Sequence, residues 1–130
     1  MPNAGDTFIV ELKRSHLEWG THRYTNTRNR IYGEGYLPIP RPHARSLSIF
    51  NSNHRSGGYI CSCTSADGYL RDVTLKATGC NERGDVYAKQ FQGRGNLRLL
   101  GEWFNAIGAA VGDCIRITWT SPTNIFIEKI

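Results

Sequence analysis

The sequence predicts a mainly β protein, and three observations support this prediction. The 130 residues are close to the commonest length of one domain and are enough to bury a core without disulfide or metal support. The 14 glycines and the repeated turn dipeptides argue against a helical bundle. About seven short apolar segments follow one another at the spacing typical of a barrel or a sandwich. We therefore expect a single domain over residues 1–130.

The first half of the chain is expected to contain three extended segments and one short helix. Residues 7–13 alternate in polarity and are predicted to form a strand. Its apolar side, expected to face the core, comprises Phe8, Val10 and Leu12. Residues 36–40 should be extended, because each proline biases the residue before it away from the helical region. Residues 42–47 can form one or two helical turns with their proline in the first turn, and residues 59–64 are the next predicted strand.

The second half is expected to contain a long hairpin, one clear helix and two final strands. Residues 70–77 and 85–91 are predicted to form the two strands of the hairpin. The helix is expected between Asn96, a favourable N-terminal cap, and Gly108. Its apolar residues recur at three- and four-residue steps: Leu97, Leu100, Phe104 and Ile107. Residues 114–120 and 125–130 are the last two predicted strands.

Positive charge is concentrated in one part of the chain. The net charge is +5 and the isoelectric point is about 9.2. Residues 13–55 contain eight Lys or Arg against two acidic residues, and all four histidines. This concentration is expected of a protein that binds a polyanion. A solvated basic face explains the charge alone equally well.

The composition argues against several classes of protein. With 39% hydrophobic residues the chain is too apolar for a disordered tail, and no apolar run approaches the ~18 residues of a membrane span. The first residues lack the basic and then apolar pattern of a signal peptide. Cys61 and Cys63 are too close together for an ordinary zinc site, and we expect them to share one strand face in the core of a cytoplasmic protein. We therefore expect no metal and no cofactor.

A search for catalytic motifs leaves one weak candidate. Asp6, Glu11 and Lys13 have the residue types of a small Mg²⁺-dependent nuclease, but Asp6 and Glu11 belong to the same short strand. Two carboxylates that hold one Mg²⁺ should come from neighbouring strands. We therefore expect no enzyme activity in this chain, with the nuclease kept as an alternative. A barrel that binds an acidic protein partner is a further alternative.

Two polar segments carry the side chains that sequence-specific recognition of DNA requires. The first is residues 23–30, Arg-Tyr-Thr-Asn-Thr-Arg-Asn-Arg, and the second surrounds Asn81-Glu82-Arg83. Cations neutralise phosphates, while Arg, Asn and acidic side chains match the major-groove edges of guanine, adenine and cytosine respectively. Two ordinary polar loops would have a similar composition, so both interpretations remain open at this point.

Several blocks of the sequence, in their order, resemble a known family. Tyr36-Leu37-Pro38-Ile39-Pro40 followed by Ala44-Arg45 looks like the strand-and-helix entry of the B3-like DNA-binding fold, and Gly112-Asp113 matches its late turn. Further blocks are similar to those of B3-like domains in restriction endonucleases, of the EcoRII N-terminal effector type and related to plant B3 domains. They are Leu17-Glu18-Trp19-Gly20, Ile49-Phe50-Asn51-Ser52-Asn53, Ala66-Asp67-Gly68-Tyr69-Leu70, Tyr87-Ala88-Lys89-Gln90-Phe91 and Trp119-Thr120-Ser121-Pro122-Thr123.

This resemblance implies a fold, a function and a set of DNA contacts. The fold is an open seven-stranded pseudobarrel with one clear and one short helix. The function is sequence-specific binding of double-stranded DNA in a prokaryotic cytoplasm, as the recognition or effector domain of a type II restriction endonuclease. Two arms, at about residues 21–35 and 73–91, would enter the major groove, with a nuclease catalytic domain in the same or another chain as a further partner. The candidate base contacts are Arg23, Asn26, Arg28, Asn29, Arg30, Lys76, Asn81, Glu82, Arg83, Asp85, Tyr87, Lys89 and Gln90. The candidate phosphate contacts are Arg41, His43, Arg45, Asn53, His54, Arg55, Gln92 and Arg94.

Overall fold

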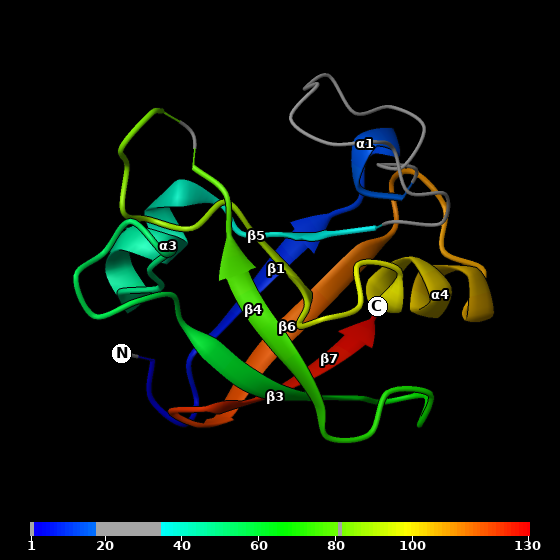
Figure 1. The fold of residues 1–130 in the computed structure, drawn as a ribbon. Helices are drawn as coiled ribbons and strands as arrows, with labels where there is room; N and C mark the ends of the chain where they lie inside the picture. The colour runs from blue at the N-terminus through cyan, green and yellow to red at the C-terminus, as the bar shows by residue number, and fades with distance from the viewer. Residues whose placement is uncertain (1, 18–34, 81) are drawn as a thin grey trace.

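Seven strands form one curled sheet that is nearly closed into a barrel (Figure 1). The computed structural model describes residues 2–17, 35–80 and 82–130. The strands are β1 (Thr7–Glu11), β2 (Leu37–Pro38), β3 (Ile60–Ser65), β4 (Val73–Thr78), β5 (Gln90–Gly93), β6 (Cys114–Ser121) and β7 (Asn124–Lys129). Their order in the sheet is β1-β6-β7-β3-β4-β5-β2, and only the pairing of β3 with β7 is parallel. The mainly β prediction with seven strands is confirmed, and the curled sheet agrees with an open pseudobarrel.

The core occupies the inside of the barrel and follows the alternation of the strands. Phe8, Val10 and Leu12 are buried as predicted, and Ile115, Ile117 and Trp119 face them from the paired strand β6. Cys61 and Cys63 are also buried in this core as free thiols. Their burial raises the pKa of Cys61 to about 12 and also raises the pKa of Cys63.

The hairpin predicted for residues 70–91 differs from the observed one in its second strand. The first strand is β4, but β5 begins only at Gln90, so the predicted strand over residues 85–91 is wrong for its first five positions. Those residues make their contacts elsewhere: Tyr87 bridges to Phe50, and the amide of Ala88 donates to the carbonyl of Ile49. Gly79, with φ +75°, turns the chain away from β4 at the point where regular pairing stops.

Two longer helices pack on the barrel, and one of them starts later than expected. The helix α3 (Arg41–Leu47) confirms the short helix predicted at 42–47, and Ser48 ends it in the left-handed region. The helix α4 (Leu99–Ala106) begins three residues after Asn96, whose Oδ1 accepts a hydrogen bond from the amide of Arg98 at 3.1 Å. Asn96 therefore stabilises a turn before the helix and does not cap the helix itself.

A single helical turn, α1 (Arg14–Leu17), follows β1 and was not predicted. It forms because His16 Nδ1 accepts from the amide of Lys13 at 3.0 Å, while the amide of His16 donates to the carbonyl of Lys13. The contact of the His16 ring corresponds to one half of a capping box, in which a side chain three residues after the cap accepts from the amide of the cap residue. Within the described residues, no helix has the length and apolar character needed to cross a bilayer.

Candidate nucleic-acid interface

The segment between β4 and β5, called the 79–89 loop from here on, carries most of the predicted contacts of the second arm. Glu82 and Arg83 are exposed at its tip, and the amide of Asp85 donates to the carbonyl of Glu82 at 3.0 Å to close a turn. The predicted base contact Asn81 lies outside the described residues. The tip therefore presents an acidic and a basic side chain to solvent, held by a local turn.

The base of the 79–89 loop is held by the buried side chain of Asn51. Asn51 is 3% exposed, and its Nδ2 lies 2.8 Å from the carbonyl oxygens of both Gly79 and Asp85. Its Oδ1 accepts from the amide of Asn53 at 2.9 Å, and Asn53 Nδ2 donates to the same Asp85 carbonyl at 3.0 Å. The loop of residues 51–57 and the 79–89 loop are thus joined side by side.

Asp85 connects this pair of loops to the helix α3. Its Oδ2 accepts from Arg41 Nε at 3.0 Å, and its Oδ1 accepts from the amide of Tyr87 at 3.2 Å. The hydrogen bond from Arg41, with that from Tyr87, lowers the pKa of Asp85, so the carboxylate is ionised near neutral pH. The Asp85 side chain is only 10% exposed, while Arg41 is 47% exposed and its Cζ lies 5.5 Å from the centre of the Tyr87 ring.

Further cations surround this contact. Arg45, one turn along α3, shares a shallow depression with Arg41, Pro42 and Ser46. Arg55 is exposed two residues after Asn53. Asp85 bonds to Arg41 and Asn53 at once, so two of the predicted phosphate contacts touch the 79–89 loop directly. Arg45 and Arg55 follow these two residues in α3 and in the loop of residues 51–57. The contacts of Asp85 thus join the three segments that carry Arg41, Arg45, Arg55 and Arg83, and we call these four residues the basic surface.

The two histidines predicted to contact phosphate pack against aromatic rings. His43 stacks on Phe8 with ring centres 4.7 Å apart, so its ring covers the core. His54 stacks on Phe50 at 3.7 Å, and Phe50 in turn lies 5.7 Å from the ring of Tyr87. His54 therefore lies at the basic surface, whereas His43 is on the side of α3 that faces the barrel.

The remaining predicted contacts lie along the strands. Lys76 and Gln92 face each other across β4 and β5, and Gln90 pairs with Thr78 where the 79–89 loop ends. Arg94 follows β5 at its far end, where its amide donates to Thr74, so the structure separates it from the loop. Lys76, Gln90 and Gln92 form a half-buried polar strip that continues from the loop.

Lys89, at the end of the 79–89 loop, is near enough to His16 in α1 to influence its charge. Burial, together with the nearby cations Lys13 and Lys89, lowers the pKa of His16 to about 4, so the imidazole is neutral near pH 7. Figure 1 shows α1 and the 79–89 loop at the same end of the barrel. The candidate base contacts Arg23, Asn26, Arg28, Asn29 and Arg30 lie outside the described residues.

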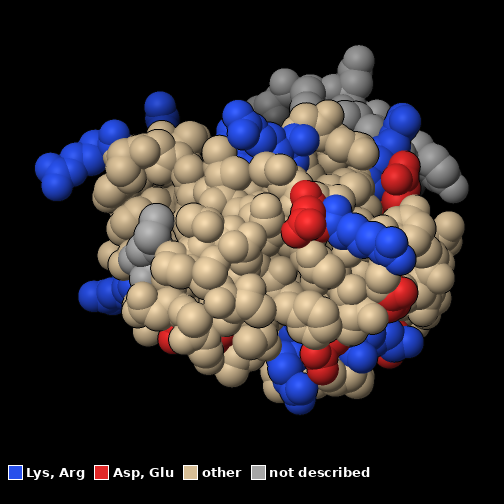
Figure 2. Space-filling model, turned by 90° about the horizontal axis from the view of Figure 1, so that it is seen from below, with Lys and Arg blue, Asp and Glu red and all other residues tan. Residues whose placement is uncertain are grey.

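The opposite end of the barrel has a different charge pattern. Figure 2 shows this face, where acidic side chains lie beside basic ones around a broad uncharged area. Elsewhere on the barrel, Arg116 and Glu128 form an ion pair between the strands β6 and β7, at 3.1 Å between Nη1 and Oε1.

The residues of the alternative nuclease site are far apart along one strand. Asp6 precedes β1 and accepts from the amide of Asn3 at 2.8 Å, whereas Glu11 ends β1 opposite Cys114. Five residues of extended chain separate them by about 16 Å. Among the described residues, no three His, Cys, Asp or Glu side chains are grouped to hold a metal ion.

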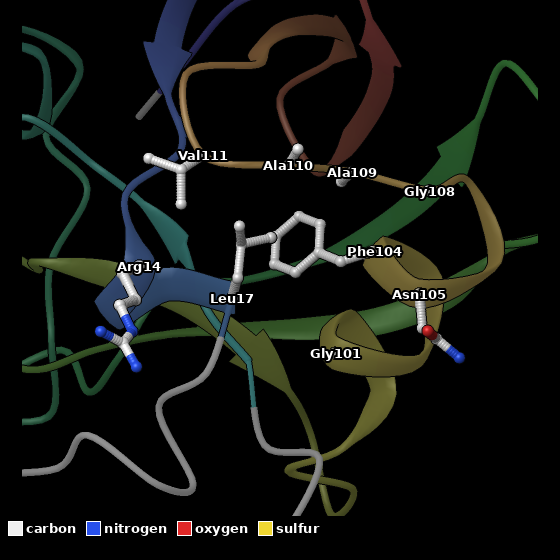
Figure 3. Close-up of a pocket in the computed structure, with 9 residues that line it drawn as sticks. All are labelled: Arg14, Leu17, Gly101, Phe104, Asn105, Gly108, Ala109, Ala110 and Val111. Atoms are coloured by element: carbon white, nitrogen blue, oxygen red, sulfur yellow. The ribbon is translucent and has the colours of Figure 1, made fainter.

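A hollow between α1 and α4 is separate from the basic surface (Figure 3). Leu17 and Phe104 point toward one another inside it, Val111 approaches from the other side, and Arg14 points away from them. None of the predicted DNA contacts that the structure describes lines it, so we do not include it in the interface.

Sequence reasoning did not identify Asn51 as the residue that holds the base of the 79–89 loop, although it lies in one of the family-like blocks. Its position in a polar loop after Phe50 gave only a local signal, typical of a turn. Its partners are 28 and 34 residues away in the chain, which no local pattern reveals.

Comparison with known proteins leaves the chain without an assigned family. No protein-family model matches it, and no curated protein matches it either.

Proposed function

We propose that this chain is a sequence-specific module that binds double-stranded DNA, with two arms in the major groove at about residues 21–35 and 73–91. The observation that carries the proposal is the joining of α3, the 51–57 loop and the 79–89 loop through Asp85. This joining gathers the cations of three segments around one projecting loop.

In the proposed interface, the chemistry and position of each side chain decide whether it contacts a phosphate or a base. Arg41, Arg45 and Arg55 border the loop and suit phosphate oxygens, because a guanidinium offers a fork of N–H donors. Arg83 and Glu82 are exposed at the tip and suit the major-groove edges of guanine and cytosine. A two-stranded ribbon with its loop has the width that the major groove of B-DNA admits.

Asp85 has a different position from the other acidic candidate. Its carboxylate is already engaged by Arg41 and by the amide of Tyr87, whereas Glu82 is exposed. In the proposed complex Asp85 orients Arg41 toward the duplex, and Glu82 is the acidic group that reaches a base. The setting that we propose for the module is the recognition or effector part of a restriction endonuclease, with the cutting chemistry in a separate catalytic domain.

Selection of bound duplexes from a random library, followed by titration at several salt concentrations, tests the proposal. We expect a defined target site and a fall in affinity of roughly 10³–10⁵-fold between 50 and 200 mM salt, if 6–10 phosphates are contacted. A matched scrambled duplex serves as the control. No enrichment of any sequence, or an affinity that does not change with salt, would contradict the proposal, and nicking of plasmid with Mg²⁺ that Glu11→Ala abolishes would favour the nuclease.

A further inference from the structure

We propose that Asn51 is the positioning residue of DNA recognition: its buried amide holds the 79–89 loop in the shape that reads base edges. The inference rests on the proposed function and deepens it. Asn51 itself contacts no base, since only 3% of it is exposed. It acts through the loop that carries Glu82 and Arg83.

The geometry of the contact supports this role. Asn51 Nδ2 donates to Gly79 and to Asp85, the two residues that flank the tip, at 2.8 Å in both cases, and lies 3.4 Å from the carbonyl of Tyr87. One amide group therefore ties both ends of a seven-residue segment together. The backbone of Asn51 adds to the attachment, because its amide donates to the carbonyl of Val86 at 2.9 Å.

Holding the loop from its base has a consequence for specificity. A loop that is already in its bound shape loses less conformational entropy when it enters the groove. Base contacts need correct geometry, whereas phosphate attraction tolerates a mobile loop. Loss of the Asn51 contact should therefore weaken binding to the target site more than binding to random DNA.

The substitution Asn51→Asp, compared with Ser52→Asp, separates this role from a change of charge. Asn51→Asp keeps the side-chain shape but places carboxylate oxygen where two carbonyl oxygens need donors. Ser52 is exposed, so Ser52→Asp adds the same charge one residue away without entering that contact. If Asn51→Asp does not fold, Asn51→Ala with Ser52→Ala as its control replaces the pair in the same measurements.

The first measurement is amide hydrogen exchange on the free protein. We expect the amides of Asp85 and Tyr87 to exchange about tenfold faster in Asn51→Asp than in Ser52→Asp, because loss of the contact frees the loop to open. The amide of Leu12, which donates to the carbonyl of Asp113 and makes no contact with the 79–89 loop in this hydrogen bond, is the internal reference. Equal exchange in the two variants would overturn the inference, whether or not the protein binds DNA.

The second measurement is the ratio of the dissociation constants for random and selected duplexes. We expect this ratio to fall about tenfold in Asn51→Asp and to stay unchanged in Ser52→Asp, with equal losses of both variants on random duplex. Equal ratios in the two variants would overturn the inference. A wild-type protein that binds no duplex would refute the proposed function, and the exchange measurement would then still decide whether Asn51 holds the loop.

Discussion

The two ends of the barrel use an aspartate in similar ways but with different results. At the far end Asp67 accepts from Trp103 Nε1 at 2.9 Å, and at the basic end Asp85 accepts from Arg41 Nε at 3.0 Å. Each carboxylate also accepts from the amide two residues later in the chain, of Tyr69 and of Tyr87 respectively. In both cases a carboxylate joins a turn to a helix, and the partner on the helix decides what the contact does.

Asp67 joins its turn to the core. Its partner Trp103 is fully buried, and Ser65, 2% exposed, donates to Asp67 and accepts from the amide of Leu70. Burial alone would raise the pKa of Asp67, but the hydrogen bonds from Trp103, Tyr69 and Ser65 outweigh it and lower the pKa. The contact therefore stabilises the fold.

Asp85 joins its loop to a side chain that stays at the surface. Arg41 is 47% exposed while it holds Asp85, and its guanidinium carries four further N–H donors on the two Nη atoms. The contact therefore orients a cation without removing it from solvent. The Asp67–Trp103 contact at the far end therefore stabilises the fold, whereas the Asp85–Arg41 contact at the basic end positions a charged side chain at the surface.

Among the variants that test this comparison, Trp103→Ala at the far end should have the largest effect, a loss of stability. Removal of a fully buried indole should lower the free energy of unfolding by about 3–5 kcal/mol, measured by urea denaturation. Trp103→Phe, which keeps a ring but loses the donor to Asp67, should cost clearly less. An equal loss in the two variants would mean that the Asp67 contact, and not packing, dominates this end.

Arg83→Ala at the basic end should have the next largest effect. We expect a loss of roughly 1–3 kcal/mol in binding to the selected duplex, and a smaller loss on random DNA, because a base contact and not only a charge is removed. Unfolding should be unchanged, since the side chain is exposed. Equal losses on all duplexes would make Arg83 a phosphate contact.

Asp67→Asn should lower stability by about 1 kcal/mol at pH 7, because hydrogen bonds to a charged acceptor are replaced by weaker ones. The folded-state pKa of Asp67 lies below its ordinary value of 3.8, so its contribution is present above that pH and is lost as the pH falls through the folded pKa. The stability difference between wild type and variant should therefore shrink below about pH 4. A stability difference that stays constant down to pH 2 would mean that the charge of Asp67 does not contribute to stability.

The smallest effect is expected from Asp85→Asn, compared with Asp72→Asn at the far end. Both remove one negative charge, and each should lower the free energy of unfolding by less than Asp67→Asn, because Asp85 contacts a surface arginine and Asp72 is exposed. Asp85→Asn should raise affinity for random duplex by less than about tenfold, because the lost charge borders the cations around Arg41. Asp72 lies at the far end, so its variant should bind random duplex like wild type. An equal gain in affinity for the two variants would mean that net charge alone, and not its position, sets this affinity.

Much of the fold, but less of the candidate site, could be predicted from the sequence. The alternation of Phe8, Val10 and Leu12 correctly identified a core-facing strand, and the prolines correctly located the region of α3. The start of β5 was predicted wrongly, because residues 85–89 have a strand-like pattern but residues 86–88 pair with residues 49–51. The exposed candidates Glu82 and Arg83 were named correctly as loop residues, whereas the roles of Asn51 and of the Asp85 carboxylate were not foreseen.

Local periodicity and turn chemistry were sufficient to define the strands, the buried faces and the basic character of the chain, because these depend on neighbours a few residues apart. The basic end itself depends on contacts between distant residues. Arg41 and Asp85 are 44 residues apart and Asn51 and Gly79 are 28 apart, yet each pair is in direct hydrogen-bond contact. Such contacts arise only when the sheet curls and brings α3, the 51–57 loop and the 79–89 loop to one end, which no local pattern encodes.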